Sequence, residues 1–74
     1  MYIKELKGYY QGDKYAGKPE GTGIVYFDNG DYLEGEFRNG RCEGRGRFVM
    51  ASRNWYEGDF RNGMADGYGK YNDT

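Results

Sequence analysis

This chain has 74 residues, of which 31% are charged and 19% aromatic, and its mean hydropathy is −1.10. A chain this short buries only about 60 to 65% of its unfolded surface, so the composition predicts a thin structure without a large conventional core. The net charge is −1 with the signs interspersed, and the longest apolar run is Ile24–Phe27. These features argue against nucleic-acid binding, secretion and a membrane span, and they favour a cytoplasmic protein, either free or peripheral to a membrane.

The predicted elements repeat along the chain with a period of 23 residues. Twelve of the fourteen glycines fall into four columns of three: Gly12/Gly35/Gly58, Gly17/Gly40/Gly63, Gly21/Gly44/Gly67 and Gly23/Gly46/Gly69. Aromatic and aliphatic positions follow the same period, as Tyr10, Leu33 and Tyr56 do. The chain is therefore predicted to be one repeat unit spanning 1–74, with a partial repeat at 1–9 and full repeats at 10–32, 33–55 and 56–74.

The first element, Met1–Lys4, matches the back half of a repeat whose front half is absent. The period aligns Tyr2 and Ile3 with Val25 and Tyr26. We therefore expect an opening strand in which Ile3 lies opposite Tyr9.

The pattern inside each full repeat is that of a β-hairpin. Residues 32–38 and 55–61 alternate aromatic or glycine with charged residues at period two. Asn39-Gly40 and Asn62-Gly63 follow them, and this dipeptide is a strong signal for a two-residue hairpin loop. Tandem hairpins predict an all-β, single-layer antiparallel meander, elongated and twisted.

The odd period requires one loop of odd length in each repeat. Strand side chains alternate with period two, so two even loops would place successive repeats on opposite faces of the sheet. Residues 28–30, Asp-Asn-Gly, suit a three-residue loop ending in a glycine bulge. The equivalent residues 51–53, Ala-Ser-Arg, lack this glycine, so this turn is the weakest part of the prediction.

This register assigns an aromatic face and a second apolar patch. The aromatic face, predicted to bind a partner, carries Val25 together with Tyr10, Leu33, Phe37, Phe48, Tyr56, Phe60 and Tyr71. Three glycine columns are predicted to lie beneath its rings, whereas the column of Gly40 marks the hairpin tips. The second patch comprises Tyr9, Tyr26, Tyr32 and Trp55, with Tyr26 opposite Tyr32 and Val49 opposite Trp55.

Near the hairpin tips the same register predicts three pairs of like charges. The pairs are Asp13 with Glu20, Glu36 with Glu43, and Asp59 with Asp66. Like charges opposite one another destabilise a sheet. One interpretation is a solvated edge neutralised by nearby arginines; the other is a docking row for a basic peptide or a divalent cation. No spacing matches an EF-hand, so we assign no metal site.

Residues Tyr56–Gly69 resemble the MORN repeat, which the family writes as Tyr-Glu-Gly-x-Trp/Phe-x-x-Gly-x-x-x-Gly-x-Gly. Leu33–Gly46 matches except at its leading residue, and Tyr10–Gly23 keeps all four glycines but has Lys14 near the central aromatic position. The resemblance implies sequential antiparallel hairpins in an elongated, groove-like sheet. It also implies an interaction scaffold, or an accessory region of an enzyme such as a lipid kinase or protein methyltransferase, with phospholipid binding in some members. The implied groove residues are the glycine columns with Tyr10, Phe37, Tyr56 and Phe60.

The sequence offers no residues for catalysis or for a cofactor. The chain has no histidine and a single cysteine, Cys42, which excludes Ser-His and Cys-His nucleophiles and zinc sites of the usual composition. No phosphate-binding glycine motif is present. We therefore predict a protein that is not an enzyme and that carries no cofactor, with Cys42 a free thiol.

The favoured hypothesis is a protein-interaction module that uses the aromatic face or an open sheet edge, as a short stand-alone inhibitor or adaptor. Two alternatives remain: an accessory fragment of a larger enzyme, and binding of anionic phospholipid headgroups. Candidate anion contacts for the lipid alternative are Arg38, Arg41, Arg45, Arg47 and Arg53. A single layer of this size barely offsets the entropy of ordering, so we also expect a homo-oligomer or an obligate complex.

Overall fold

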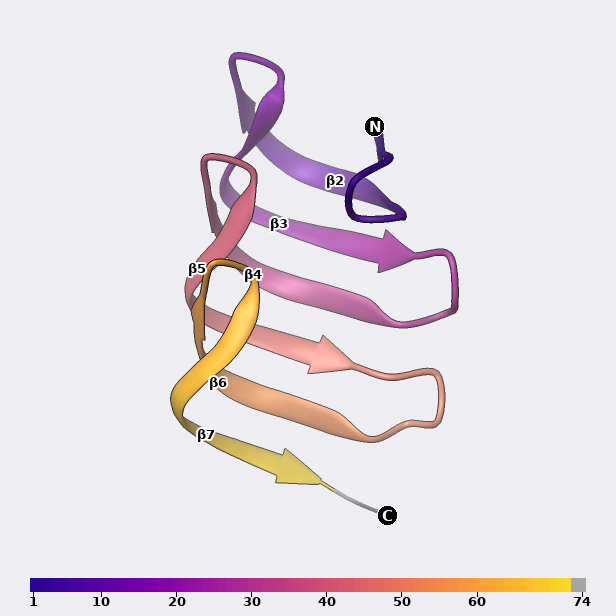
Figure 1. The fold of residues 1–74 in the computed structure, drawn as a ribbon, viewed down its shortest axis with the longest axis vertical. Helices are drawn as coiled ribbons and strands as arrows, with labels where there is room; N and C mark the ends of the chain where they lie inside the picture. Colours follow the sequence, from indigo (N-terminus) through magenta and orange to yellow (C-terminus); the bar gives the residue numbers. More distant parts are fainter. Residues whose placement is uncertain (73–74) are drawn as a thin grey trace.

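The computed structural model describes residues 1–72, and these residues form one open antiparallel sheet of seven strands in sequence order (Figure 1). No helix occurs in this range. The final two residues of the predicted repeat 56–74 lie outside the described residues. The strands are β1 (Tyr2–Ile3), β2 (Gly8–Tyr15), β3 (Lys18–Phe27), β4 (Tyr32–Arg38), β5 (Arg41–Val49), β6 (Trp55–Arg61) and β7 (Met64–Asn72). The predicted fold class is confirmed.

Two-residue loops close the hairpin tips, as predicted from the Asn-Gly dipeptides. Arg38 pairs with Arg41, and the intervening Asn39 and Gly40 have φ angles of 55° and 86°. Both central residues of this turn type need positive φ, which asparagine and glycine tolerate better than other residues. Ala16-Gly17 and Asn62-Gly63 adopt the same conformation.

At the opposite end of the strands the loops have three residues. This odd loop length keeps successive repeats on the same face of the sheet although the period is odd. The backbone N–H of Phe27 donates to the carbonyl of Asp31 at 2.9 Å, and the N–H of Gly30 donates to Phe27 at 3.0 Å. In the next repeat the N–H of Met50 donates to Asn54 at 2.8 Å. Arg53 occupies the position in this loop that Gly30 occupies in the previous one, and it has a φ of 78°. The loop without its glycine therefore keeps the same geometry, with an arginine in a conformation that costs energy.

The prediction for the opening strand is wrong by one residue. Ile3 pairs with Gly8, and Tyr2 pairs with Tyr9. The connection at residues 4–7 has four residues, and Lys7 adopts a φ of 55°. Because an even loop exchanges the two faces, Ile3 packs against the core and Tyr2 lies on the other face with Tyr9.

The predicted pairs of acidic residues are also wrong, because each long hairpin contains a bulge. In β4 and β5, Phe37 pairs with Cys42 but Gly35 pairs with Gly46. Glu36 of β4 therefore lies opposite three residues of β5, at positions 43–45. The carboxylate of Glu36 lies over Gly44, where a Cβ would come within 2.7 Å of its Oε1. Gly44 also has a φ of 95°, which the bulge requires.

The same bulge recurs in the other two hairpins. Shifts occur between Gly12 and Lys14 and between Gly58 and Phe60. Asp13 accordingly lies over Gly21, and Asp59 lies over Gly67. A two-residue shift leaves every side chain on its predicted face, which is why the faces are right although the pairs are not.

Beside each bulge, glycine pairs bring two strands into close approach. A Cβ at Gly35 would lie 2.7 Å from the Cα of Gly46, and Gly12–Gly23 and Gly58–Gly69 are similarly close. The hairpin tips beyond these glycines turn out of the plane of the strands (Figure 1). The glycine pairs therefore permit a bend that gives the single layer a concave inner face.

The core lies on this inner face. Its buried members are Tyr10, Val25, Leu33, Phe37, Cys42 and Phe60. The rings of Tyr10 and Tyr56 cover Gly23 and Gly69, so this glycine column lies beneath rings as predicted. The other two columns were also predicted to lie beneath rings. The column of Gly35 instead allows the close approach of two strands, and the column of Gly44 forms the bulges.

Candidate binding surfaces

Cross-strand pairing joins the predicted aromatic face into one continuous inner row. The row runs from β2 to β7 through Tyr10, Val25, Leu33, Phe48, Tyr56 and Tyr71. Exposure along it rises from 1% at Tyr10 to 6% at Leu33 and 70% at Tyr71. The inner row is therefore sealed near the N-terminus and open at the last strand.

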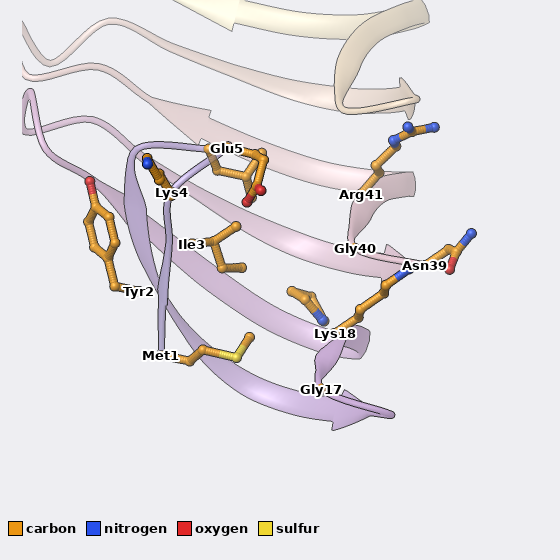
Figure 2. A pocket seen from close by; sticks show the side chains of 12 residues that line it. Met1, Tyr2, Ile3, Lys4, Glu5, Gly17, Lys18, Asn39, Gly40 and Arg41 are labelled. Atoms are coloured by element: carbon orange, nitrogen blue, oxygen red, sulfur yellow. The ribbon is translucent and has the colours of Figure 1, made fainter.

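The seal at the first hairpin is the N-terminal segment. Met1, Ile3 and Leu6 pack against the core, and the N–H of Tyr10 donates to the carbonyl of Met1 at 2.7 Å. A cleft of about 560 Å³ separates this segment from the hairpin tips. Figure 2 shows Ile3 pointing into the cleft, with Lys18 and Arg41 at its rim.

At the other end the inner face holds an open apolar groove of about 300 Å³. Its lining residues are Phe27, Leu33, Phe48, Tyr56, Phe60, Gly63, Met64 and Ala65. Phe60 and Tyr56 form an edge-to-face pair with ring centroids 5.5 Å apart. We call this site the open groove, and it adjoins β7, an edge strand whose Met64 and Tyr68 are 69% and 89% exposed.

Of the predicted partner-binding residues, four are buried: Tyr10, Leu33, Phe37 and Phe60. Tyr10 and Phe37 pack edge to face with centroids 5.2 Å apart, and this pair repeats the geometry of Tyr56 and Phe60. These four side chains stabilise the sheet itself. Phe48, Tyr56 and Tyr71 are the members of the prediction that retain exposed surface.

The second apolar patch also forms a continuous row, on the outer face of the sheet. This outer row consists of Tyr2, Tyr9, Tyr26, Tyr32, Val49, Trp55 and Asn72, one from each strand. Tyr2, Tyr9 and Tyr26 are 54%, 53% and 48% exposed. The structure thus brings the four predicted residues together with Val49, as predicted, and adds Tyr2 where Ile3 was expected.

The five candidate anion contacts are spread over the molecule. Arg45 forms an ion pair with Asp59 at 3.7 Å, and Arg47 lies between Glu34 and Glu57 in the sheet register. Arg38 and Arg41 share a hairpin tip, whereas Arg53 lies in a loop at the other end of the strands. No single cluster collects all five.

Sequence reasoning missed a contact between successive hairpins. The backbone N–H of Asn39 donates to Glu20 at 2.9 Å, and the N–H of Asn62 donates to Glu43 at 2.5 Å. Beside them, the N–H groups of Gly40 and Gly63 donate to carbonyls of the preceding hairpin, each at 3.0 Å. The sequence does contain a signal for this contact: a glutamate lies 19 residues before each Asn-Gly tip, and the pair recurs after 23 residues.

Cys42 is buried at 1% exposure on the inner face. Burial raises the pKa of its thiol to about 11, and the charges of Glu43 and Glu36 add to the shift. A thiol in this environment stays protonated and unreactive at neutral pH. Within residues 1–72 no three side chains of His, Cys, Asp or Glu gather in a group that could hold a metal ion.

Comparison with known proteins adds one finding. A family model described as the MORN repeat matches residues 10–32, 34–54 and 56–73. No curated protein matches the chain significantly. Over the described part of the chain, no helix is long and apolar enough to cross a membrane.

Proposed function

Since this chain belongs to the MORN-repeat family, whose repeat is a non-catalytic module associated with protein or membrane-lipid interaction, we propose that it is a protein-binding module of the cytoplasm. The partner occupies the open groove and adds a strand to the edge of β7. In this role the chain serves as a scaffold or adaptor and performs no chemistry of its own.

The observation that carries this proposal is the rise in exposure along the inner row. Tyr10 is sealed by the N-terminal segment, but Tyr71 has no equivalent cover in the described residues. An apolar groove beside an unpaired strand edge offers pockets for side chains and hydrogen bonds for a backbone. An extended segment with apolar residues at alternate positions has the chemistry to use both.

The other candidate functions have less support from the geometry. Anionic headgroups are held by clustered cations, but the arginines of this chain are dispersed and partly matched with carboxylates. An accessory role within a larger enzyme uses the same open groove and is therefore not a separate mechanism. The protein partner remains the proposal that the open groove supports best.

A pull-down from cytosolic extract tests the proposal. The double variant Met64→Ser/Tyr71→Ser removes apolar surface from the open groove and β7 without touching the buried core. Tyr15→Ser is the matched control, because Tyr15 is 74% exposed on the first hairpin. We expect the double variant to lose the partner and the control to retain it. Equal capture by all three proteins would show that binding uses another surface.

A further inference from the structure

The outer face carries a second row beside its aromatic one, and this row alternates in charge. Cross-strand pairing joins Gln11, Ile24, Glu34, Arg47, Glu57 and Lys70 in that order from β2 to β7. All four charged residues are exposed. The ion pairs described among residues 1–72 involve Arg45 with Asp59 and Arg61 with Asp66, so these four charges have no intrachain ion-pair partner there.

We propose that two copies of this chain pack outer face to outer face, related by a two-fold axis that runs along the strands between β4 and β5. The sheet is a single layer, so the outer row has no second layer against which to pack. Two-fold dimers are the commonest homo-oligomers, and their interface packs the same surface of both subunits together. The inference is independent of the partner site in the open groove, which lies on the inner face.

The alternation of charge makes the outer face self-complementary about this axis. The rotation exchanges β4 with β5, so Glu34 of each copy meets Arg47 of the second copy. The same operation sets Glu57 opposite Ile24 and Lys70 opposite Gln11, and no like charges face each other. Complementary charges favour this register over any that sets like charges opposite each other, such as an axis along β4 that would place Glu34 against Glu34.

The apolar row fits the same axis. Tyr32 meets Val49 of the second copy, and Tyr26 meets Trp55, so aromatic rings cover aliphatic and aromatic surface from β3 to β6. An axis between β5 and β6 would leave Tyr9 and Tyr26 outside the contact, whereas one between β3 and β4 would cover the apolar row but set Glu34 opposite Ile24 and Arg47 opposite Gln11. The central axis is therefore the one that both pairs opposite charges and covers the apolar row from β3 to β6.

Charge reversal with mixing tests the proposal directly. Glu34→Arg alone places two arginines in contact across the interface, and Arg47→Glu alone places two glutamates in contact. A mixture of the two single variants restores both opposite-charge pairs between copies, although neither chain regains its own cross-strand match. We expect wild-type chains of 8.5 kDa to double in mass between about 1 and about 200 µM, the single variants to stay monomeric, and their equimolar mixture to dimerise.

Sedimentation equilibrium measures these masses, and circular dichroism checks that each variant is folded. Lys14→Glu, on the first hairpin tip, is the control charge reversal and should dimerise as wild type does. The proposal is overturned by a wild-type protein that stays monomeric across the range, by single variants that still dimerise, or by a mixture that stays monomeric. Met64→Ser/Tyr71→Ser should dimerise normally, which separates this contact from the partner site.

Discussion

The pairing of a tyrosine with a glycine explains much of this fold at the scale of single residues. The hydroxyl end of the Tyr10 ring covers Gly23, and the hydroxyl donates to the carbonyl of Asp13 at 2.6 Å. Tyr56 repeats this arrangement over Gly69, with its hydroxyl 3.2 Å from the carbonyl of Asp59. The tyrosine therefore fills the bare backbone and also satisfies a carbonyl inside the bulge.

Adding a methyl group at Gly23 should be strongly destabilising. The new Cβ would overlap the Tyr10 ring, which is buried and cannot move aside, so we expect Gly23→Ala to lower the free energy of unfolding by roughly 2 to 4 kcal/mol. Urea denaturation of the variant beside wild type measures this loss.

Two further variants separate overlap with the ring from the effects of backbone conformation. Gly40→Ala has open space around its Cβ and a φ of 86°, so it should lose only about 1 kcal/mol. Tyr10→Leu gives the first repeat the residue that the second repeat has at Leu33 and removes the ring over Gly23. Combined with Gly23→Ala, it should therefore be less destabilised than the sum of its single changes. A Gly23→Ala protein as stable as wild type would refute the ring contact.

The buried thiol of Cys42 makes the free energy of unfolding depend on pH in the alkaline range. Its pKa is raised from 9.0 to about 11, so below pH 9 both the folded and the unfolded chain keep the proton. Between pH 9 and 11 the unfolded chain releases the proton while the folded chain retains it. The free energy of unfolding should therefore fall by roughly 1 to 3 kcal/mol over this interval.

Cys42→Ala provides the comparison, because it lacks the titrating group and shares every other one. Denaturant midpoints measured from pH 8 to pH 11 should fall more steeply for wild type than for the variant. Parallel curves would mean that the folded protein leaves this thiol accessible to water.

At the scale of elements, the hydrogen bonds between successive hairpins decide how rigidly the tips stack. Glu43 accepts from the backbone of Asn62, and Glu20 does the same for Asn39 one repeat earlier. A charged acceptor strengthens such a bond, and each bond joins two hairpins that are already neighbours in the sheet. The acidic side chains near the tips thus bind the backbone of the next turn.

Glu43→Ala should loosen the tip of the third hairpin. We expect a loss of about 1 to 2 kcal/mol in the free energy of unfolding, with faster hydrogen exchange at the amide of Asn62 than elsewhere. Glu5→Ala is a matched control, because the Glu5 side chain is exposed and accepts no hydrogen bond from a hairpin tip, and it should change neither quantity measurably. Unchanged exchange at Asn62 in the Glu43 variant would contradict the contact.

At the scale of the whole molecule, the sequence predicts the hairpin order, both loop lengths and the two faces. These follow from period two, period 23 and the chemistry of Asn-Gly, all of which are local signals. The register near the tips was not predictable, because the bulge depends on how Glu36 and Gly44 pack across two strands. The position of Ile3 was missed because a partial repeat has no second copy from which to infer its loop length.

The candidate site likewise has a part that the sequence predicts and a part that it does not. The inner and outer rows follow from alternation, so their residues could be named in advance. The exposure of side chains along the inner row could not be predicted, because it depends on how Met1, Ile3 and Leu6 cover one end of this row. The whole molecule is therefore asymmetric, although its repeats are alike.

Hydrogen exchange of β7 with and without the captured partner tests the central claim most directly, which is that the open end of the inner face is the binding site. Free protein should show its weakest strand protection at β7, since one edge of this strand is unpaired. Binding should protect the amides of Met64–Asn72 and leave those of β2 unchanged. Protection that appears at β1 and β2, with none at β7, would contradict the account.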